Sequence, residues 1–512
     1  MTSTVVTVLA QNGLNFTHDF CTDSAELSSV SSNYADSNNF FVIGTTRTDT
    51  TYPQHGFVAS FNYNGKLVWT KKLLHPGKYN AYSSNYSIIK SGIDKYSIIG
   101  TIFTTGKPWR PYIYIFNSNG DSINYWEYNL DTICTRYFSS IVNDGSNFIA
   151  AGTIFCSNPG PTPDSASLWL CKFDSVGNTV WDRKYYTVYP GIANVGKIAL
   201  SSDSLHYIVA VNMRPGQSGQ MHSSILKLDT AGNVIWLKTL PKPYISENDV
   251  DIVTNPTGGY YFVSSVSLAP PLSDGSPGYS SIYYGKLDEN GDTIWTKNFN
   301  GYFNNSSGNQ IAWTPNKNHL IILAGPVSKT RAGAMKIDTS GNVIWHRFYR
   351  NTYGKDWWLT YDRLISLSVT PDNRYLMAGG YSDKPIQDKL LSWMILTDSN
   401  GCRYPNDSAC VPVSVLLDKS SSDNTVKIYP NPVNGIFYIE ATPPTATGQA
   451  VLSGEDVIAE VTDIYGRKLL RTKLQPGDNA VNMTQQPAGV YVVHVTRAGR
   501  VICSRKLVKQ WD

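Results

Sequence analysis

The sequence predicts an all-β protein of two domains, a seven-bladed β-propeller followed by a small immunoglobulin-like β-sandwich. Three observations support this prediction. A unit of 50 to 60 residues recurs along the chain as far as residue 401. Within each unit, turn residues separate short alternating apolar runs, which is typical of β-strands. After residue 401 the repeat stops, and a different series of short strands follows.

The composition agrees with many short strands and tight turns. Of 512 residues, 16% are charged and 12% aromatic, with 40 glycines and 27 prolines. The net charge is +4, and the sequence contains no basic tract of the kind that binds nucleic acid. No window approaches the ~20 apolar residues of a membrane-spanning helix. We therefore expect neither a nucleic-acid partner nor a transmembrane segment.

The repeat is clearest where a turn glycine precedes a tryptophan strand, in residues 228–238, 286–297 and 336–347. With a degraded copy at each end, the turn glycines are Gly13, Gly65, Gly120, Gly177, Gly232, Gly291, Gly341 and Gly401. Seven intervals separate these eight turns, so we expect seven repeats. Four strands per repeat, such as 140–143, 148–153, 168–174 and 177–183, form one propeller blade.

The tryptophan of each repeat is interpreted as a packing residue between blades. This applies to Trp69, Trp126, Trp181, Trp236, Trp295 and Trp345. The repeats begin with an outermost-type strand, residues 14–20, and end with a third-type strand, residues 392–397. The N-terminal strand is thus expected to complete the seventh blade and leave no open edge. We expect deletion of residues 1–20 to destabilise the ring.

Residues 13–401 resemble the pyrroloquinoline-quinone-type repeat propellers, in which a turn glycine precedes a tryptophan strand in every blade. They are also similar to the repeat propellers of secreted bacterial proteins. The resemblance concerns the fold. No constellation for binding the quinone accompanies it, and no histidine or cysteine spacing indicates a metal site. We therefore expect no cofactor and no metal.

The remainder of the chain is predicted to be a separate domain. Residues 1–12 form an N-terminal segment, which could be the remnant of a signal peptide. Residues 402–425 are rich in Ser, Asp and Pro and are predicted to be a linker. Residues 426–512 contain about seven short alternating strands, the pattern of a small immunoglobulin-like sandwich.

Four motifs in this last domain resemble the type A C-terminal sorting domain of the type IX secretion system. The matching residues are Tyr429, Pro430, Asn431, Pro432, Gly435, Asp463, Gly466, Arg467, Pro487, Ala488, Gly489 and Tyr491. The resemblance implies a Bacteroidetes-type protein that passes through the periplasm and is then secreted or displayed on the outer-membrane surface. It also implies two partners, the translocon and its sortase-like protease, with cleavage in the linker before Val426.

A binding face is expected where the variable loops of the propeller emerge. The connections from the outermost to the next innermost strand, and from the second to the third strand, share one face. Function tends to lie on variable loops that a rigid scaffold holds. Candidate ligand contacts are Tyr79, Trp109, Arg110, Tyr302, Tyr353, Lys355, Trp357 and Trp358. Rigid aromatics with Arg suit a glycan or a protein surface, although each could simply pack its loop.

A secreted propeller enzyme, a polysaccharide hydrolase or lyase, is the alternative. It requires two or more convergent titratable groups at the central channel. Glu247, Asp249 and Asp251 cluster, but we interpret them as a solvated loop. Residues 288–292 resemble a calcium loop, and we interpret them as an Asx turn. No nucleophile-elbow or phosphate-loop motif is present, so no catalytic residue is predicted.

The seven cysteines leave several arrangements open. Cys402 and Cys410 could close a small loop, and Cys156 and Cys171 could face each other across two strands. Cys21, Cys134 and Cys503 have no evident partner in the sequence. Unpaired buried thiols are an equally good interpretation.

Overall fold

A computed structural model gives the fold of the chain. It describes residues 14–18, 26–48, 54–73, 79–81, 88–103, 108–128, 134–145, 147–156, 165–185, 193–213, 222–241, 250–267, 280–299, 306–326, 332–349, 361–382, 391–403, 426–441, 457–463, 468–475, 477–487, 489–497 and 500–509. Every regular element in these segments is a β-strand. The chain divides into two compact units, Met1–Arg403 and Tyr404–Asp512.

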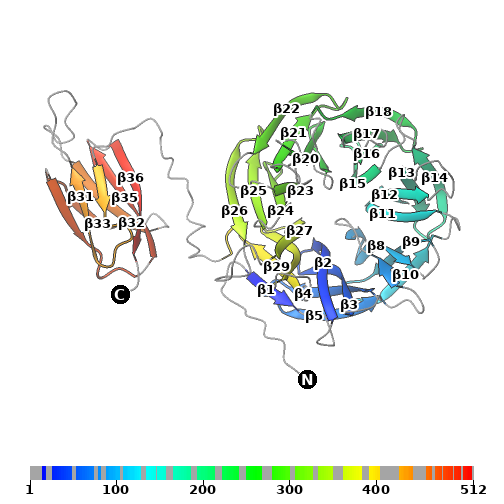
Figure 1. The fold of residues 1–512 in the computed structure, drawn as a ribbon, viewed down its shortest axis with the longest axis horizontal. Helices are drawn as coiled ribbons and strands as arrows, with labels where there is room; N and C mark the ends of the chain where they lie inside the picture. Colours follow the sequence, from blue (N-terminus) through cyan, green and yellow to red (C-terminus); the bar gives the residue numbers. More distant parts are fainter. Residues whose placement is uncertain are drawn as a thin grey trace, which may run out of the picture. The chain divides into compact units, whose positions relative to one another are not determined.

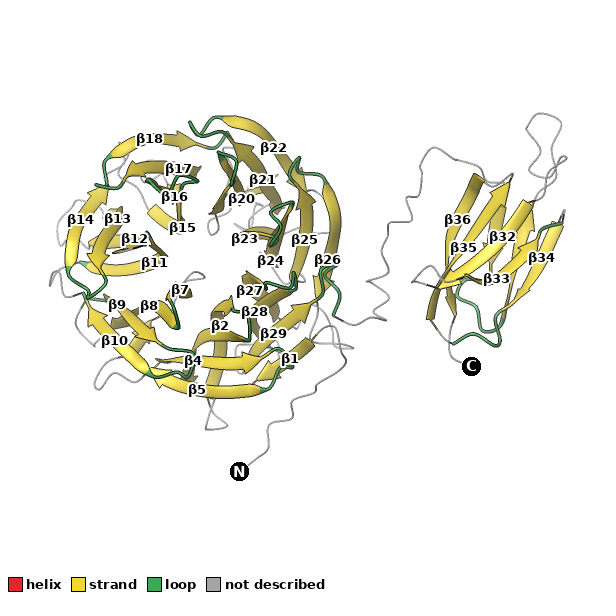
Figure 2. Ribbon diagram, turned by 180° about the vertical axis from the view of Figure 1, so that it is seen from behind, coloured by secondary structure: helices red, strands yellow, loops and turns green. Residues whose placement is uncertain are grey.

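The described strands of the first unit form seven sheets arranged in a ring (Figures 1 and 2). We number the sheets from the N-terminus. From the first sheet to the seventh, the innermost strands are β2 Glu26–Ala35, β7 Ile88–Gly92 with β6 Tyr79–Ala81, β11 Thr135–Asn143, β15 Ala193–Leu200, β19 Val250–Thr254, β23 Ser306–Trp313 and β27 Tyr361–Val369. The second strands are β3 Asn39–Thr48, β8 Lys95–Phe103, β12 Asn147–Cys156, β16 His206–Met213, β20 Tyr260–Ser267, β24 His319–Pro326 and β28 Tyr375–Ser382.

The outer half of each sheet continues the same antiparallel order. The third strands are β4 Gln54–Asn62, β9 Arg110–Phe116, β13 Ser165–Asp174, β17 His222–Asp229, β21 Ser280–Leu287, β25 Ala332–Asp338 and β29 Leu391–Thr397. The outermost strands are β5 Leu67–Leu73, β10 Ser122–Glu127, β14 Thr179–Tyr185, β18 Val234–Thr239, β22 Thr293–Phe299, β26 Val343–Tyr349 and, in the seventh sheet, β1 Leu14–His18.

The seventh sheet combines strands from both ends of the first unit. Its order is β1-β29-β28-β27, and β1 runs antiparallel to β29 with Leu14 opposite Leu396 and His18 opposite Ser392. The backbone groups on the outer edge of β29 therefore bond to the start of the chain. The first sheet then packs on the seventh through a core that includes Phe40, Phe57 and Met394.

The core of the ring is divided among the contacts between neighbouring sheets. Seven hydrophobic clusters occupy these contacts, each built from two successive sheets. The third and fourth sheets, for example, bury Leu170 and Val209 against each other. Because successive side chains of a strand point to opposite faces, both faces of a sheet are apolar, and each faces one neighbour.

In five of the seven sheets, the tryptophan of the outermost strand lies on the turn glycine of the following sheet. The seven described turn glycines have φ between 75° and 92°, a conformation that glycine adopts without a steric penalty. A Cβ on Gly177 would lie 2.3 Å from Trp126 Nε1, and one on Gly341 would lie 2.5 Å from the Trp295 ring. The indole thus occupies the space that a side chain would need.

The same contact recurs in three further sheets, whereas the third sheet differs and the outermost strand of the seventh, β1, contains no tryptophan. Trp69, Trp236 and Trp345 lie on Gly120, Gly291 and Gly401. A Cβ on Gly232 would instead meet Tyr185 and Arg183 of the third sheet, and Trp181 of the same sheet donates a hydrogen bond to the Thr230 carbonyl at 3.3 Å. The interpretation of these tryptophans as packing residues between blades agrees with these contacts.

The turn before each tryptophan strand is an Asx turn. The Asp288 carboxylate accepts hydrogen bonds from the backbone N–H groups of Asn290 and Asp292, at 2.9 and 2.8 Å. Asp174 does the same for Val176 and Asn178. These carboxylates hold their own turns, which confirms the interpretation of residues 288–292 as an Asx turn.

The second unit contains two sheets that share one core. One sheet has the order β30-β31-β34 and the other β33-β32-β35-β36. Their bounds are β30 Val426–Tyr429, β31 Ile436–Ala441, β32 Val457–Asp463, β33 Lys468–Lys473, β34 Gly477–Asn482, β35 Gly489–Arg497 and β36 Arg500–Lys509. Phe437 and Val481 of the first sheet pack against Val461 and Val493 of the second.

The contact between tryptophan and glycine can be tested with two glycine substitutions in the third sheet. Gly177→Ala should lower the free energy of unfolding by about 3 kcal/mol, because the new methyl group meets Trp126 and the backbone has a positive φ. Gly145 also has a positive φ, 104°, but a Cβ there meets nothing within 4 Å. Gly145→Ala should therefore cost only about 1 kcal/mol. Equal losses in chemical denaturation would contradict the proposed contact.

Closure of the ring by β1 makes a second prediction. Deleting residues 1–20 should lower the free energy of unfolding by more than ~2 kcal/mol, because the β29 edge loses its hydrogen-bonded partner. Deleting residues 1–12 keeps β1 and serves as the control. Thermal unfolding of both truncated proteins measures the difference. Identical midpoints would show that β1 does not stabilise the ring.

Candidate functional site

Two of the eight predicted contact residues have described side chains. Trp109 is 40% exposed, and Arg110 begins β9 and is half-buried. Tyr79 begins β6, whose backbone alone is described. Tyr302, Tyr353, Lys355, Trp357 and Trp358 lie outside the described residues. The structure thus brings Trp109 and Arg110 together on the face where the second and third strands of a sheet are connected.

A rigid cluster supports the backbone of Trp109. The Trp109 carbonyl accepts a hydrogen bond from the backbone N–H of Arg136, at 3.2 Å. The Arg136 guanidinium is buried, lies 5.4 Å from the Trp169 ring centroid, and has Nη1 3.5 Å from Asp182 Oδ2. Trp169 is completely buried and stacks on Phe138. The exposed indole of Trp109 therefore stands on a fixed platform, as a contact residue requires.

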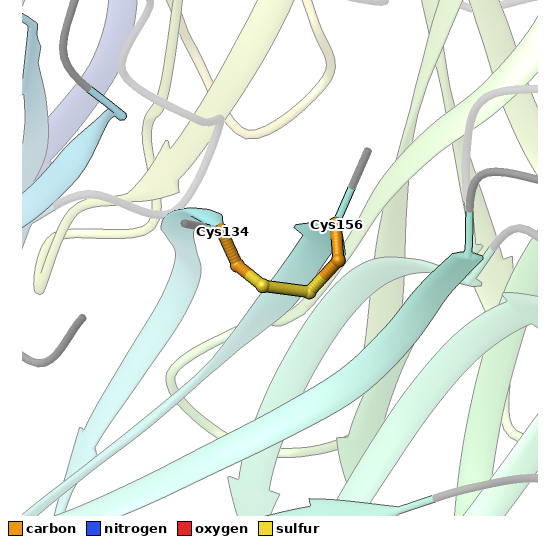
Figure 3. The surroundings of a disulfide bond; sticks show 2 residues. All are labelled: Cys134 and Cys156. Atoms are coloured by element: carbon orange, nitrogen blue, oxygen red, sulfur yellow. A yellow bond between two sulfur atoms is a disulfide. The ribbon is translucent and has the colours of Figure 1, made fainter. Parts of the chain in front are cut away.

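A disulfide joins two variable connections on the same face. Cys134 directly precedes β11, Cys156 ends β12, and the two form a disulfide with Cα atoms 4.4 Å apart (Figure 3). The possible pairing of Cys156 with Cys171 is wrong, since Cys171 is a buried thiol on β13. Cys134 and Cys156 come from antiparallel neighbours at the same end of the sheet, so they face each other.

The other cysteine arrangements are only partly within the described residues. Cys402 is buried, and its thiol donates to the Asn400 carbonyl at 3.7 Å. Cys410 and Cys21 lie outside the described residues. The possible loop between Cys402 and Cys410 thus stays a prediction.

A cavity of about 190 Å³ lies at the centre of the ring. All seven innermost strands contribute to its lining. These residues are Ser32, Asn33, Tyr34, Ile88, Ile89, Ser140, Ile141, Lys197, Ile198, Asp251, Gln310, Ile311, Ala312, Ser366, Leu367 and Ser368.

Polar residues beside the cavity link neighbouring sheets. Each innermost strand is an edge of its sheet, so alternate backbone N–H groups point away from that sheet. A side chain of the preceding sheet in the ring accepts one of these N–H groups in four cases. The pairs are Ile198 with Ser140 Oγ (3.2 Å), Ile311 with Asp251 Oδ2 (2.8 Å), Asn33 with Ser366 Oγ (2.9 Å) and Leu367 with Gln310 Oε1.

The interpretation of Asp251 as part of a solvated loop is wrong. Asp251 lies in β19 and has no exposed surface. Its Oδ1 accepts the N–H of Ile252 at 2.6 Å and lies 3.2 Å from Lys197 Nζ, while Oδ2 accepts the N–H of Ile311. Both oxygens are engaged, so this carboxylate links sheets. Glu247 and Asp249 lie outside the described residues.

The enzyme alternative requires convergent titratable groups at this channel. Among the cavity-lining residues Asp251 is the one carboxylate, and Lys197 is the one cation. Burial raises the pKa of Tyr34, and the charge of Asp36 raises it further, so this hydroxyl stays neutral. A pair of carboxylates suited to general acid–base hydrolysis is not formed by the lining residues.

An ion pair and a tyrosine join the third and fourth sheets farther out. Asp144 Oδ2 lies 2.9 Å from Lys172 Nζ and accepts a hydrogen bond from Tyr207 OH at 2.8 Å. Burial alone raises the pKa of Asp144, but the hydrogen bonds from Lys172 and Tyr207 outweigh it and hold the pKa below its usual value. These groups stabilise the scaffold and lie away from the cavity lining.

The residues of the predicted sorting motif hold the second unit together. Asn431 bonds to the last strand twice, through Nδ2 to the Lys506 carbonyl at 2.6 Å and through Oδ1 to the Val508 N–H at 2.9 Å. Tyr429 OH donates to Asp478, and this bond raises the pKa of Tyr429 to about 12. Tyr491 OH donates to the Pro487 carbonyl.

The other motif residues are placed as follows. A Cβ on Gly435 would lie 2.9 Å from Thr484 Cγ2, so glycine permits this close approach. Pro430 and Pro432 are exposed, Gly489 begins β35, and Asp463 ends β32. Gly466, Arg467 and Ala488 lie outside the described residues.

Comparison with known protein families identifies the domain family of the second unit. Residues 427–510 match the family described as the secretion system C-terminal sorting domain, which confirms the prediction for this part of the chain. No curated protein matches the chain. The sorting domain implies export to the cell surface or secretion. The described part of the chain has no helix with the length and apolar character to cross a membrane.

Solved structures of two kinds of peptidase match the chain at low identity. An acylaminoacyl peptidase of Pyrococcus horikoshii is 10% identical, with a TM-score of 0.40, over 81% of this chain and 58% of that one. A structure from an analysis of two prolyl endopeptidases is 13% identical, with a TM-score of 0.40, over 81% of this chain and 53% of that one. This chain therefore spans little more than half the length of either peptidase.

The disulfide on the variable face can be tested directly. Replacing Cys134 and Cys156 by Ser should lower the free energy of unfolding by about 3 kcal/mol, because the bond closes a loop in the unfolded chain. A reducing agent should destabilise the unaltered protein similarly and leave the double variant unchanged. Cys171→Ala is the control and should keep the response to reduction. A reducing agent without effect on the unaltered protein would rule out the bond.

Proposed function

We propose that this chain is an exported binding protein of a Bacteroidetes-type bacterium. Residues 13–401 are proposed to form a seven-bladed β-propeller that β1 closes. Residues 402–425 are proposed as a linker and 426–512 as an immunoglobulin-like sorting domain. The type IX translocon and its sortase-like protease are the proposed partners in export. The match of residues 427–510 to the sorting-domain family supports this part of the proposal.

The propeller is proposed to recognise a glycan or a protein through its variable-loop face. The observation that carries this proposal is Trp109, a large aromatic that stays 40% exposed on a buried platform. Large rigid aromatics with fixed backbones give much contact area at little entropic cost. Arg110 adjoins it and adds a planar charged group. Tyr79, Tyr302, Tyr353, Lys355, Trp357 and Trp358 are proposed as further contacts.

The test uses the full chain on a glycan array and on a panel of extracellular-matrix and host surface proteins. Trp109→Ala should weaken binding at least tenfold, because a central aromatic contact typically contributes ~2 kcal/mol or more. Ile93→Ala is the matched control. Ile93 is 96% exposed in the same sheet, on the turn between β7 and β8 at the opposite face. Its substitution should leave affinity unchanged.

Two results would overturn the proposal. Absence of binding to every glycan and every protein in the panels would remove the binding function. Binding that is the same in Trp109→Ala, Trp357→Ala, Trp358→Ala and the unaltered protein would remove the proposed face. Binding to glycans alone, or to proteins alone, identifies which of the two ligand classes is correct.

A further inference from the structure

One polar side chain beside the central cavity breaks the usual rule for buried groups. Asn33 is 5% exposed, and neither its Nδ2 nor its Oδ1 has a hydrogen-bond partner among the described residues. Buried amides are nearly always paired, because an unpaired donor or acceptor loses its hydration without compensation. Local violations of this kind occur preferentially at functional sites.

Two hydrogen bonds fix the backbone of Asn33, although its side-chain amide is unpaired within the described residues. Its N–H donates to Ser366 Oγ at 2.9 Å, and its carbonyl accepts from Ser368 Oγ at 3.0 Å. Both contacts come from the seventh sheet and fix the junction that closes the ring. The side chain has no part in either bond. Contacts with the seventh sheet therefore account for the position of the Asn33 backbone, but they do not account for its side-chain amide.

The cavity that Asn33 borders is large and has two kinds of wall. Its volume of about 190 Å³ would hold about six water molecules. Ile88, Ile89, Ile141 and Ile198 form an aliphatic wall from the second, third and fourth sheets. Lys197 and the serines of the seventh sheet lie among the remaining lining residues. An occupant with an apolar side and a hydroxylated edge fits both walls.

The charge of the cavity is balanced, which disfavours an ionic occupant. Lys197 is the cation of the lining, and its Nζ lies 3.2 Å from the buried Asp251 carboxylate. That carboxylate is also held by two backbone N–H groups. An added charge would lose its hydration without gaining a counter-ion. The Asn33 amide, by contrast, offers one donor group and one acceptor, which together match a hydroxyl.

We propose that the central cavity binds one small neutral polyhydroxylated molecule, of the size of a monosaccharide or cyclic polyol. Its hydroxyls accept from Nδ2 and donate to Oδ1 of Asn33, and its C–H face lies on the isoleucines. Because neither amide atom is exposed to solvent, the Asn33 side chain turns toward the cavity when the ligand binds. This site is separate from the variable-loop face and does not depend on it.

The experiment measures thermal unfolding and calorimetric binding of the full chain with glucose, galactose, mannose, N-acetylglucosamine, myo-inositol and glycerol. Glucuronate and glucosamine are charged comparators of similar size. At least one neutral ring compound should raise the unfolding midpoint in a concentration-dependent manner. The charged analogue of that compound should bind at least tenfold more weakly. A crystal structure with the bound compound should show Asn33 in a changed rotamer.

Asn33→Ala should weaken this binding at least tenfold without lowering stability in the absence of ligand, because it removes a buried unpaired amide. Asn290→Ala is the control, since Asn290 is an exposed turn residue outside the lining. Ala312→Leu fills the cavity while keeping Asn33, and should also abolish binding. If Asn33→Ala does not fold, Ala312→Leu still tests whether the cavity binds the compound.

Three outcomes would overturn the proposal. These are no stabilisation by any neutral probe, tighter binding of a charged comparator, and water alone in the cavity of crystals soaked with the probes. Failure here is distinguishable from failure of the loop-face proposal. Trp109→Ala should leave binding of the small probe unchanged, and Asn33→Ala should leave binding to arrays unchanged.

Discussion

The first unit depends on the contact between an indole and a left-handed glycine. At five of the described turn glycines, the tryptophan of the preceding sheet fills the volume that a side chain would need, at distances as short as 2.3 Å from a virtual Cβ. The contact sets how closely two sheets approach at the rim. Apolar clusters fill the middle of each junction, and at four junctions side chains that bond to backbone N–H groups of the next sheet close the inner end. The junctions between the fifth and sixth sheets and between the sixth and seventh sheets have all three kinds of contact.

Much of this arrangement is predictable because it is local in sequence. Within most hairpins a turn glycine precedes a tryptophan strand, so this spacing repeats visibly and counts the sheets, although the glycine that an indole contacts lies in the following sheet. Trp126 shows that the spacing between the turn glycine and the tryptophan can vary. It lies two residues farther from its glycine than the other tryptophans do, and the two-residue period of a strand returns it to the same face.

The inner end of each junction was not predictable in the same way. Ser140 and Ile198 are 58 residues apart, and Gln310 and Leu367 are 57 apart, and the packing of neighbouring sheets that brings each pair together leaves no residue signature. Asp251 illustrates the resulting error, since its neighbours suggested a solvated loop while the fold buries it. The only signal was a polar residue, such as Ser140 or Asp251, beside apolar residues of an inner strand. The Cys134–Cys156 pair was missed for the related reason that the strand register determines which ends meet.

The seventh sheet takes strands from both ends of the ring, and the sorting domain follows it in the chain. Closure therefore needs the earliest and the latest strands of the unit to be present together. A chain that stops anywhere before residue 426 lacks the matched sorting domain altogether. Because the sorting domain follows the ring in the chain, its presence shows that the whole ring was synthesised first. The export signal can therefore act only on chains that contain every strand the ring requires.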